Sequence, residues 1–264
     1  MMTVAFEADR FRSTAAYYTR YRVPYPDSLI QKVAIETGFR AGERLLDLGC
    51  GPGQLGIAFA RLAGAAVIGM DPEPEMLEAA REAARQEGVA AEFRQGSSYD
   101  LGPGLGPLAL TVMGRSFHWM DRAQTLQSLD SLTRNGGAVV LFGDRHISCA
   151  PDWRGLLNEL STRFSPERAA ERDKRRSADW APHEAFLLES PFNDLLRIGV
   201  VEKRHLTADD IVGRAFSMSV TSVQALGGRA KAFEAALRSE LAALSSGGDY
   251  CEYVETFGLI ARRS

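Results

Sequence analysis

The chain has 264 residues, of which 45% are hydrophobic and 25% are charged, and its formal net charge is −3. This composition is typical of a globular protein, and it excludes a basic protein that binds nucleic acid or an anionic membrane through its overall charge. Three dispersed cysteines exclude a disulfide framework, and the dispersed histidines and cysteines predict no metal site.

The sequence indicates neither export nor membrane insertion. The N-terminal stretch lacks an apolar core of signal-peptide length. The longest uncharged run, residues 101–114, is broken by glycines and prolines and is too short to cross a bilayer. We therefore expect a cytoplasmic monomer or homodimer that has neither a membrane nor a nucleic acid as a partner.

The regular elements begin after an aromatic and basic segment, YYTRYRVPYP at residues 17–26, whose prolines stop a helix. Residues 27–38 have helical periodicity, residues 44–48 are an apolar strand, and residues 54–62 are an amphipathic helix. Strands at 65–70, 91–96, 108–114 and 138–144 and helices at 74–86 and 122–133 continue the pattern. Strands that alternate with helices predict an α/β fold with a Rossmann-like, doubly wound sheet.

The pattern changes after Asp144. Residues 145–190 look mostly helical, and we interpret them as a cap insertion over the carboxyl edge of the sheet, where ligands bind in open α/β sheets. A capping-box pattern at Thr207 predicts the start of a helix that reaches Met218. The remaining elements are a strand at 198–207, a helix at 229–244 and a final strand at 251–263.

These elements predict one domain over residues 1–264, with a sheet of about seven strands that is mostly parallel and has an antiparallel C-terminal strand. Its expected parts are an N-terminal helical arm at 1–40, a cofactor-binding core at 41–144, the helical cap at 145–190, and C-terminal strands and helices at 191–264 that complete the sheet.

A glycine loop, DLGCGPG at residues 47–53, lies directly between the first strand and the helix that follows it. Glycines let the backbone approach a ligand closely, and the N–H groups at a helix start point towards it. The next strand ends at Asp71, 18 residues after Gly53, where a carboxylate can accept both hydroxyls of a ribose. This order of elements predicts a site for a nucleoside cofactor.

The spacing of the glycines in this loop distinguishes between the candidate nucleoside cofactors. Dinucleotide-binding loops have the pattern G-x-G-x-x-G and hold a pyrophosphate, whereas this loop is G-x-G-x-G with Asp47 before it. An acid suits a ligand that carries an ammonium group, held directly or through water, better than a diphosphate. S-adenosylmethionine has an ammonium group, a ribose and an adenine, and no phosphate.

The motifs LLDLGCGPG, GMDPEPEML, SFHWMD and YRVPYP resemble those of the class I S-adenosylmethionine-dependent methyltransferases. Within that class they resemble the small-molecule branch of methyltransferase type 11 and trans-aconitate methyltransferase-like enzymes. The resemblance covers roughly residues 15–145. It implies that the glycines border the methionine and ribose parts of the cofactor, that Asp47 lies near the amino group, and that Asp71 holds the ribose hydroxyls. The cofactor-binding residues that it implies are Tyr18, Arg22, Asp47, Gly49, Cys50, Gly51, Gly53, Asp71, Pro72, Met76, Ser97, Ser98, Arg115 and Phe117.

The sequence departs from the family at Ser97, where an aspartate usually accepts from the adenine amino group. A serine hydroxyl can accept as well, although more weakly. The segment at 17–26 also allows two interpretations. Either Tyr18 or Tyr21 covers the sulfonium while Arg22 meets the cofactor's carboxylate, or the segment is only a docked arm.

His118 follows the fourth strand at the carboxyl edge, where a histidine can act as a general base that removes a proton from the substrate. The alternative is that His118 and Trp119 pack at the start of a helix that Asp121 caps. The basic stretch at 163–176 is interpreted as a solvated helix face, and the alternative is a contact with an anion or RNA. The aromatic residues that we expect around a substrate pocket with His118 are Trp119, Trp153, Trp180 and Phe216.

The sequence as a whole predicts an enzyme that transfers a methyl group from S-adenosylmethionine to an oxygen, nitrogen or carbon atom of a small molecule and releases S-adenosyl-L-homocysteine. Two alternatives stay open: a methyltransferase that acts on RNA or protein, and a non-methylating protein that keeps the cofactor as a scaffold. The net charge of −3 argues against RNA.

Overall fold

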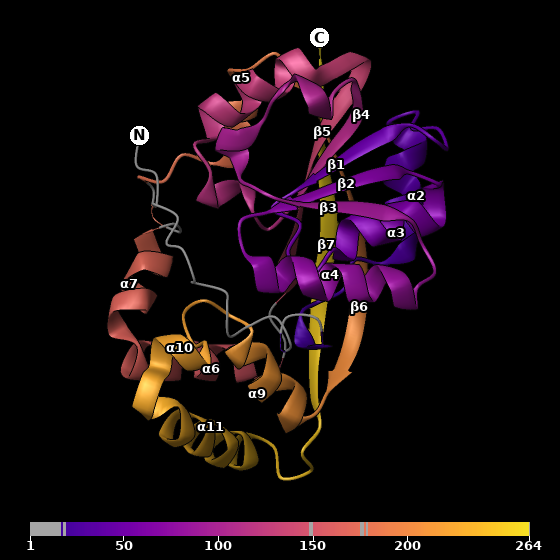
Figure 1. The fold of residues 1–264 in the computed structure, drawn as a ribbon. Coiled ribbons are helices and arrows are strands. Elements are labelled where there is room, and N and C mark those ends of the chain that lie inside the picture. The colour runs from indigo at the N-terminus through magenta and orange to yellow at the C-terminus, as the bar shows by residue number, and fades with distance from the viewer. Residues whose placement is uncertain (1–16, 18–19, 148–149, 175–176, 178, 264) are drawn as a thin grey trace.

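A computed structural model describes residues 17, 20–147, 150–174, 177 and 179–263 (Figure 1). Its sheet has seven strands in the order β3-β2-β1-β4-β5-β7-β6. Neighbours among β1–β5 are parallel, whereas β7 runs antiparallel to both β5 and β6. The strands are β1 (Arg44–Leu48), β2 (Ala66–Asp71), β3 (Ala91–Gln95), β4 (Leu108–Gly114), β5 (Thr133–Ile147), β6 (Asp194–Leu206) and β7 (Tyr250–Arg262). The predicted Rossmann-like sheet with an antiparallel C-terminal strand is confirmed.

Helices cover both faces of the sheet because successive side chains of a strand point to opposite faces. Leu45 of β1 packs with α2 (Asp27–Glu36) and α3 (Gln54–Ala63), and α4 (Pro74–Gln86) packs beside α3 over Phe93 of β3. Leu46 and Leu48 pack on the other face with α5 (Arg122–Leu132) and α8 (His183–Leu188). Short 3₁₀ helices connect these elements at Ser98–Asp100 (η1), Pro103–Leu105 (η2) and Phe117–Trp119 (η3).

Two strands are longer than the sequence predicts. We expected a strand at 138–144, but β5 continues to Ile147, and β6 starts at Asp194 rather than at residue 198. Both strands pair with β7, whose residues from Tyr253 to Arg262 have partners in both neighbours. The backbone hydrogen bonds to β7 therefore keep β5 and β6 extended beyond their most apolar residues.

The cap differs from the expected one because helices from two segments build it. These are α6 (Trp153–Phe164) and α7 (Pro166–Lys174) from the first segment and α9 (Ala208–Phe216), α10 (Val223–Leu226), η4 (Gly227–Arg229) and α11 (Ala230–Leu244) from the second. Helices α6, α9 and α11 share one apolar cluster, and the cap helices lie together beside the lower part of β6 and β7 (Figure 1).

The expectation that the helices within 191–264 complete the sheet was wrong, because α9–α11 pack with α6, whereas β6 and β7 do complete it. The register explains this arrangement. The carboxyl end of β6, Leu206, pairs with Tyr250, and the carboxyl end of β5, Ile147, pairs with Tyr253. Both segments therefore leave the sheet at the same edge, where their apolar faces meet.

No helix in the described part of the chain is long and apolar enough to cross a membrane.

The expected capping box is present at the start of α9, where Thr207 Oγ1 accepts from the N–H of Asp210 at 3.2 Å. Replacing Thr207 with alanine should lower the free energy of unfolding by about 1 kcal/mol, because this N–H loses its acceptor. Chemical denaturation measures the change. The matched control is Thr162→Ala on α6, where the exposed hydroxyl bonds the carbonyl of Asn158 one turn earlier. Equal destabilisation by the two substitutions would contradict the capping role.

Candidate functional site

A cavity of about 550 Å³ lies at the carboxyl ends of β1–β4 and reaches the cap. Each of these strands supplies residues from the loop that follows it, and the N-terminal segment and the cap supply the rest. The lining residues are Arg22, Leu48, Gly49, Gly51, Pro52, Asp71, Pro72, Glu73, Met76, Gly96, Ser97, Ser98, Tyr99, Gly114, Arg115, Ser116, His118, Trp119, Met120, Arg172, Trp180, His183, Met218, Ser219 and Val220.

The glycine loop forms one wall of the cavity. Gly49, Gly51 and Gly53 have φ values of 69°, 53° and 79°, a left-handed conformation that favours glycine. A Cβ atom at Gly49 would lie 2.6 Å from Cβ of Ser116, so the loop after β1 can lie against the loop after β4 only because this residue is glycine. Gly49 and Gly51 line the cavity as expected.

The other two loop residues expected at the cofactor do not line this cavity. A Cβ atom at Gly53 would be 3.1 Å from Ala80 Cβ and 3.2 Å from the Phe93 ring, so the side of this residue where a Cβ would lie packs on α4 and β3. Cys50 is buried in the same apolar cluster as Phe93, and burial raises the pKa of its thiol well above the usual value. Packing, rather than ligand contact, explains the small residues at both positions.

Asp71 is the acid that ends β2, and it lines the cavity while it is only 8% exposed. Its Oδ2 accepts from the N–H of Gly51 at 2.8 Å, and its Oδ1 accepts from the N–H of Glu73 at 3.0 Å. Burial raises the pKa of Asp71, and these two hydrogen bonds oppose the rise. Each carboxylate oxygen has a second lone pair that can accept from a ligand hydroxyl.

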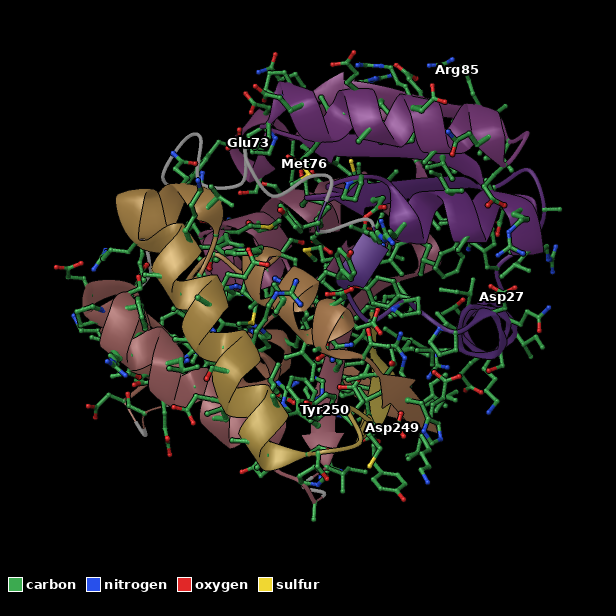
Figure 2. All side chains as sticks on the ribbon, turned by 90° about the horizontal axis from the view of Figure 1, so that it is seen from below. Asp27, Glu73, Met76, Arg85, Asp249 and Tyr250 are labelled. Atoms are coloured by element: carbon green, nitrogen blue, oxygen red, sulfur yellow. The ribbon has the colours of Figure 1, made fainter. Side chains whose placement is uncertain are left out.

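The residues that follow Asp71 lead into α4 and contribute side chains to the cavity. Glu73 and Met76 lie at one end of this helix, and Arg85 lies at the other end, on the surface far from the cavity (Figure 2). Glu73, Met76 and Pro72 all line the cavity. Glu73 is 4% exposed and was not predicted as a site residue, because a charged residue before a helix is ordinarily a surface residue.

Asp47, which was expected near the cofactor's amino group with contact made directly or through water, does not line the large cavity. The alternation along β1 turns Asp47 towards α3, where its Oδ2 accepts from the N–H of Gly56 at 2.8 Å. It borders a second cavity of about 20 Å³ that shares Gly49, Gly51 and Gly114 with the large one. Burial raises the pKa of Asp47 to about 7.

The loop after β3 contributes Ser97 and Ser98 to the cavity, as expected. Ser97 begins the short helix η1: its Oγ donates to Asp100 Oδ2 at 2.9 Å and accepts from the N–H of Tyr99 at 3.3 Å. The backbone N–H of Ser97 donates to the same Asp100 oxygen at 2.8 Å, and these bonds hold the pKa of Asp100 below its usual value. The serine that replaces the family's usual aspartate is therefore fixed by a neighbouring aspartate.

Of the two cofactor-binding residues predicted in the loop after β4, one lines the cavity and the other does not. Arg115 lines the cavity in a left-handed conformation with a φ of 56°, which is uncommon for a residue other than glycine. Its Nε donates to Asp144 at 2.5 Å, and its Nη2 donates to the carbonyl of Val23 at 2.9 Å. Phe117 does not line the cavity, because it is 2% exposed and packs in the apolar core of the sheet.

The N-terminal segment contributes Arg22, whose Nη2 donates to the carbonyl of Ser217 at 3.1 Å. Tyr18 lies outside the described residues. Tyr21 packs its ring on Gly213 of α9 and stacks on Tyr17, with 6.2 Å between ring centroids, so it is not among the residues that line the cavity.

Of the residues expected in a substrate pocket, His118, Trp119 and Trp180 line the cavity, whereas Trp153 and Phe216 do not. Trp153 is 1% exposed in the cap, and its Nε1 donates to the carbonyl of Cys251 at 3.0 Å. Phe216 packs its ring on Phe233 of α11. Both aromatic residues belong to the core of the cap, because the apolar faces of α6 and α9 are turned towards α11.

Residues that no motif indicated also line the cavity: Arg172 of α7, His183 of α8 and the segment 218–220 after α9. They lie 50 residues or more beyond the recognised motifs, and only the tertiary structure brings them to the cavity. The aromatic and basic composition of 163–190 was the only signal for Arg172 and His183, and the sequence held no signal for 218–220.

Residues 45–137 match the family described as a methyltransferase domain. This segment is a class I methyltransferase domain. The resemblance to the S-adenosylmethionine-dependent methyltransferases is thus confirmed for this segment by sequence.

The methyltransferase domain has relatives with different targets. Ubiquinone biosynthesis O-methyltransferase from Xanthomonas axonopodis is 36% identical over 103 residues, which are 38% of this chain and 43% of that protein. Ribosomal protein L11 methyltransferase from Marinobacter nauticus is 37% identical over 105 residues, which are 39% of this chain and 34% of that protein. The chain spans less than half the length of these curated relatives.

The fold of the whole chain is similar to that of a solved methyltransferase. A SAM-dependent methyltransferase from Thiobacillus denitrificans, in complex with S-adenosyl-L-homocysteine, has a TM-score of 0.54 and 17% sequence identity. The similarity covers 99% of this chain and 100% of that one. At this identity the comparison shows a shared fold.

The raised pKa of Asp47 makes stability depend on pH in a defined direction. The folded protein binds a proton on Asp47 that the unfolded chain releases above its ordinary pKa of 3.8, so this residue lowers stability as the pH rises from 4 to about 7. Removing the charge in Asp47→Asn should abolish this component. The free energy of unfolding at pH 5 and pH 7.5, measured by denaturant titration, should therefore fall more steeply with pH in the wild type.

Asp27→Asn is the matched control, because Asp27 is exposed and paired with Arg61 on the surface. The structure predicts a pH dependence for this variant close to that of the wild type. Parallel pH profiles for the wild type and Asp47→Asn would show that Asp47 does not hold a proton near neutral pH.

Proposed function

We propose that the cavity binds S-adenosylmethionine and that the protein transfers the methyl group of this cofactor to a small molecule held against the cap. The observation that supports this proposal best is the position of Asp71. A buried carboxylate at the end of β2 lines the cavity beside a glycine loop in left-handed conformation, and each of its oxygens retains an accepting lone pair.

The residues present fit the cofactor part by part. Asp71 accepts the two ribose hydroxyls, and the loop at Gly49 and Gly51 leaves room for the ribose and methionine parts. Pro72 and Met76 offer apolar contact to the adenine. Tyr99, Ser97 and Ser98 border the same end of the cavity, where the serine hydroxyls can bond the edge of the base.

The methionine end needs partners for a carboxylate and an ammonium group. Arg22 lines the cavity with a guanidinium that can pair with the carboxylate. Asp47 is separated from the large cavity by the glycine loop, but the small cavity beside it has room for one water molecule that can bridge the carboxylate and the ammonium. Of the two contacts that the sequence left open, direct and through water, this arrangement favours the one through water.

The chemical step is a direct displacement. When bound, S-adenosylmethionine supplies a methyl group on a positively charged sulfur. As the acceptor atom forms its bond to the methyl carbon, the bond between sulfur and that carbon breaks and its electron pair stays on sulfur. The protein's task is to hold the acceptor in line with that bond, for which effective molarities of ~10⁵–10⁸ M are attainable. The cap residues Trp180, Arg172 and Met218 close the cavity on the acceptor's side.

His118 keeps its proposed role as the group that receives the acceptor's proton. It lines the cavity next to Trp119, with 4.6 Å between the ring centroids, and 6.4 Å from the ring of His183. An imidazole has a pKa suited to this exchange near neutral pH. The alternative, that His118 only packs at η3, predicts no effect on the rate of transfer.

The residues that the segments after β5 add to the cavity support a small acceptor over a macromolecule. Helices from two segments of the cap cover the end opposite the glycine loop, and lining residues come from α7, α8 and the loop after α9. Protein or RNA would need an open surface beside the methyl group, and RNA would also need a positive one. The net charge of −3 does not favour RNA.

S-adenosyl-L-homocysteine at about 100 times its dissociation constant should raise the free energy of unfolding by ~2.7 kcal/mol, visible as an increase in Tm. Asp71→Ala should lose most of this increase, because the ribose hydroxyls lose their acceptor. Asp27→Ala, on the surface of α2, should keep it (Figure 2). The Tm of each variant without ligand separates loss of binding from loss of folding. Equal stabilisation of the two variants would contradict the assigned ribose site.

The acceptor class can be tested by measuring S-adenosyl-L-homocysteine formed from the cofactor with a panel of phenols, carboxylic acids and amines, and with ribosomal protein and RNA fractions. We expect turnover with a member of the small-molecule panel. Turnover only with protein or RNA would overturn the small-molecule assignment, and binding without any turnover would favour a scaffold role. With the acceptor so found, unchanged single-turnover rates across pH in His118→Ala would exclude the base role.

A further inference from the structure

The cap end of the cavity has a charge distribution different from the cofactor end. The two acids that line the cavity, Asp71 and Glu73, both follow β2. Helices α7 and α8 contribute Arg172 and His183 instead. Arg172 is paired with the exposed Asp173, so its charge is partly neutralised, and a second cation behind the wall decides the sign of this end.

That second cation is Arg122, the first residue of α5, which is 1% exposed. Its guanidinium carbon lies 3.8 Å from the centroid of the Phe186 ring and 4.6 Å from that of the Trp180 ring. Nη1 donates to the carbonyl of Ala181 at 2.7 Å, and Nη2 has no hydrogen-bond partner among the described residues. No carboxylate within the described ranges forms an ion pair with it, although burying a cation without a counter-charge is costly.

Arg122 also determines which ring nitrogen of His183 carries a proton. Nη1 of Arg122 lies 3.3 Å from Nδ1 of His183. Because an arginine has donors and no acceptor, Nδ1 must be the unprotonated nitrogen, and the neutral ring then carries its hydrogen on Nε2. Burial and the charge of Arg122 lower the pKa of His183 to about 4, so the ring stays neutral near pH 7.

At Nε2, the neutral His183 ring can therefore donate a hydrogen bond and cannot accept one. Nδ1 is turned to the buried Arg122, and the ring lines the cavity, so the Nε2 edge is the one available to a ligand. Its role differs from that of His118, which would have to accept a proton. The indole rings of Trp119 and Trp180 also line the cavity, and the face of an indole ring suits contact with a planar group.

We propose that His183 donates a hydrogen bond from Nε2 to an anionic oxygen of a planar acceptor substrate, a carboxylate or a phenolate, and that the buried charge of Arg122 is matched by this anion. The inference rests on the proposed function, since it assigns the substrate class of the same cavity. His183 is a specificity-determining residue in this assignment, and Arg122 is a positioning residue that acts through it.

The test measures binding rather than turnover. The protein is first titrated with S-adenosyl-L-homocysteine, and the loaded protein is then titrated calorimetrically with benzoate and with benzamide, which has nearly the same shape and no charge. Benzoate should bind about tenfold more tightly, because a hydrogen bond to an anion near a buried cation is stronger than one to an amide.

Two variants separate hydrogen bonding from packing. His183→Gln retains an N–H donor near the position of Nε2 and loses the ring, so it should keep the preference for benzoate. His183→Phe retains a ring that can pack on Phe117, which lies 5.1 Å from His183 between centroids, and loses the donor, so the preference should disappear. A residue that only packs would show the opposite order.

Each outcome decides the proposal. A preference for benzoate in the wild type and in His183→Gln that is lost in His183→Phe supports it. Binding of neither probe, equal binding of both, or a preference that survives in His183→Phe overturns it, while the first titration shows that the cofactor site is intact. Failure of S-adenosyl-L-homocysteine to bind overturns the proposed function and this inference together.

Discussion

The carboxylate of Asp71 is the interaction on which the rest of the site depends. It accepts one N–H from the glycine loop, at Gly51, and one from the turn that leads into α4, at Glu73. Burial of a charge is unfavourable, and these two hydrogen bonds offset part of that cost. The same carboxylate thus fixes two walls of the cavity and presents acceptors to it, so the geometry of the loop and the position of these acceptors depend on one another.

A buried ionic network joins the cap to the sheet behind this site. Glu252 of β7 is 1% exposed and pairs with Arg214 of α9 at 2.5 Å and with His146 of β5 at 3.3 Å. Although burial by itself raises the pKa of Glu252, His146 and Arg214 lower it to about 2. His146 also contacts Asp144, which pairs with Arg115 at the edge of the cavity. The position of the cap is therefore coupled through charged contacts to the loop after β4.

The sequence predicted the half of the site that binds the cofactor better than the half that faces the cap. Gly49, Gly51 and Asp71 line the cavity as expected because strand, loop and helix follow one another within a short stretch of chain. Trp153 and Phe216 were assigned to the substrate pocket by residue type alone, and both pack inside the cap. Asp47 was expected to meet the cofactor directly or through water, and the alternation of side chains in β1 turns it away from the large cavity towards α3.

The sequence by itself determined the order of strands and helices, the doubly wound sheet and the acid at the end of β2 that lines the cavity, because local periodicity and turn chemistry encode these features. Only the tertiary structure decided that α9–α11 join α6 in one cap, since that depends on two strands ending at the same edge. It also decided that Arg122 and His183, 61 residues apart, meet behind the cavity wall. Contacts between residues so distant in the chain follow from packing of complementary faces, which no local pattern records.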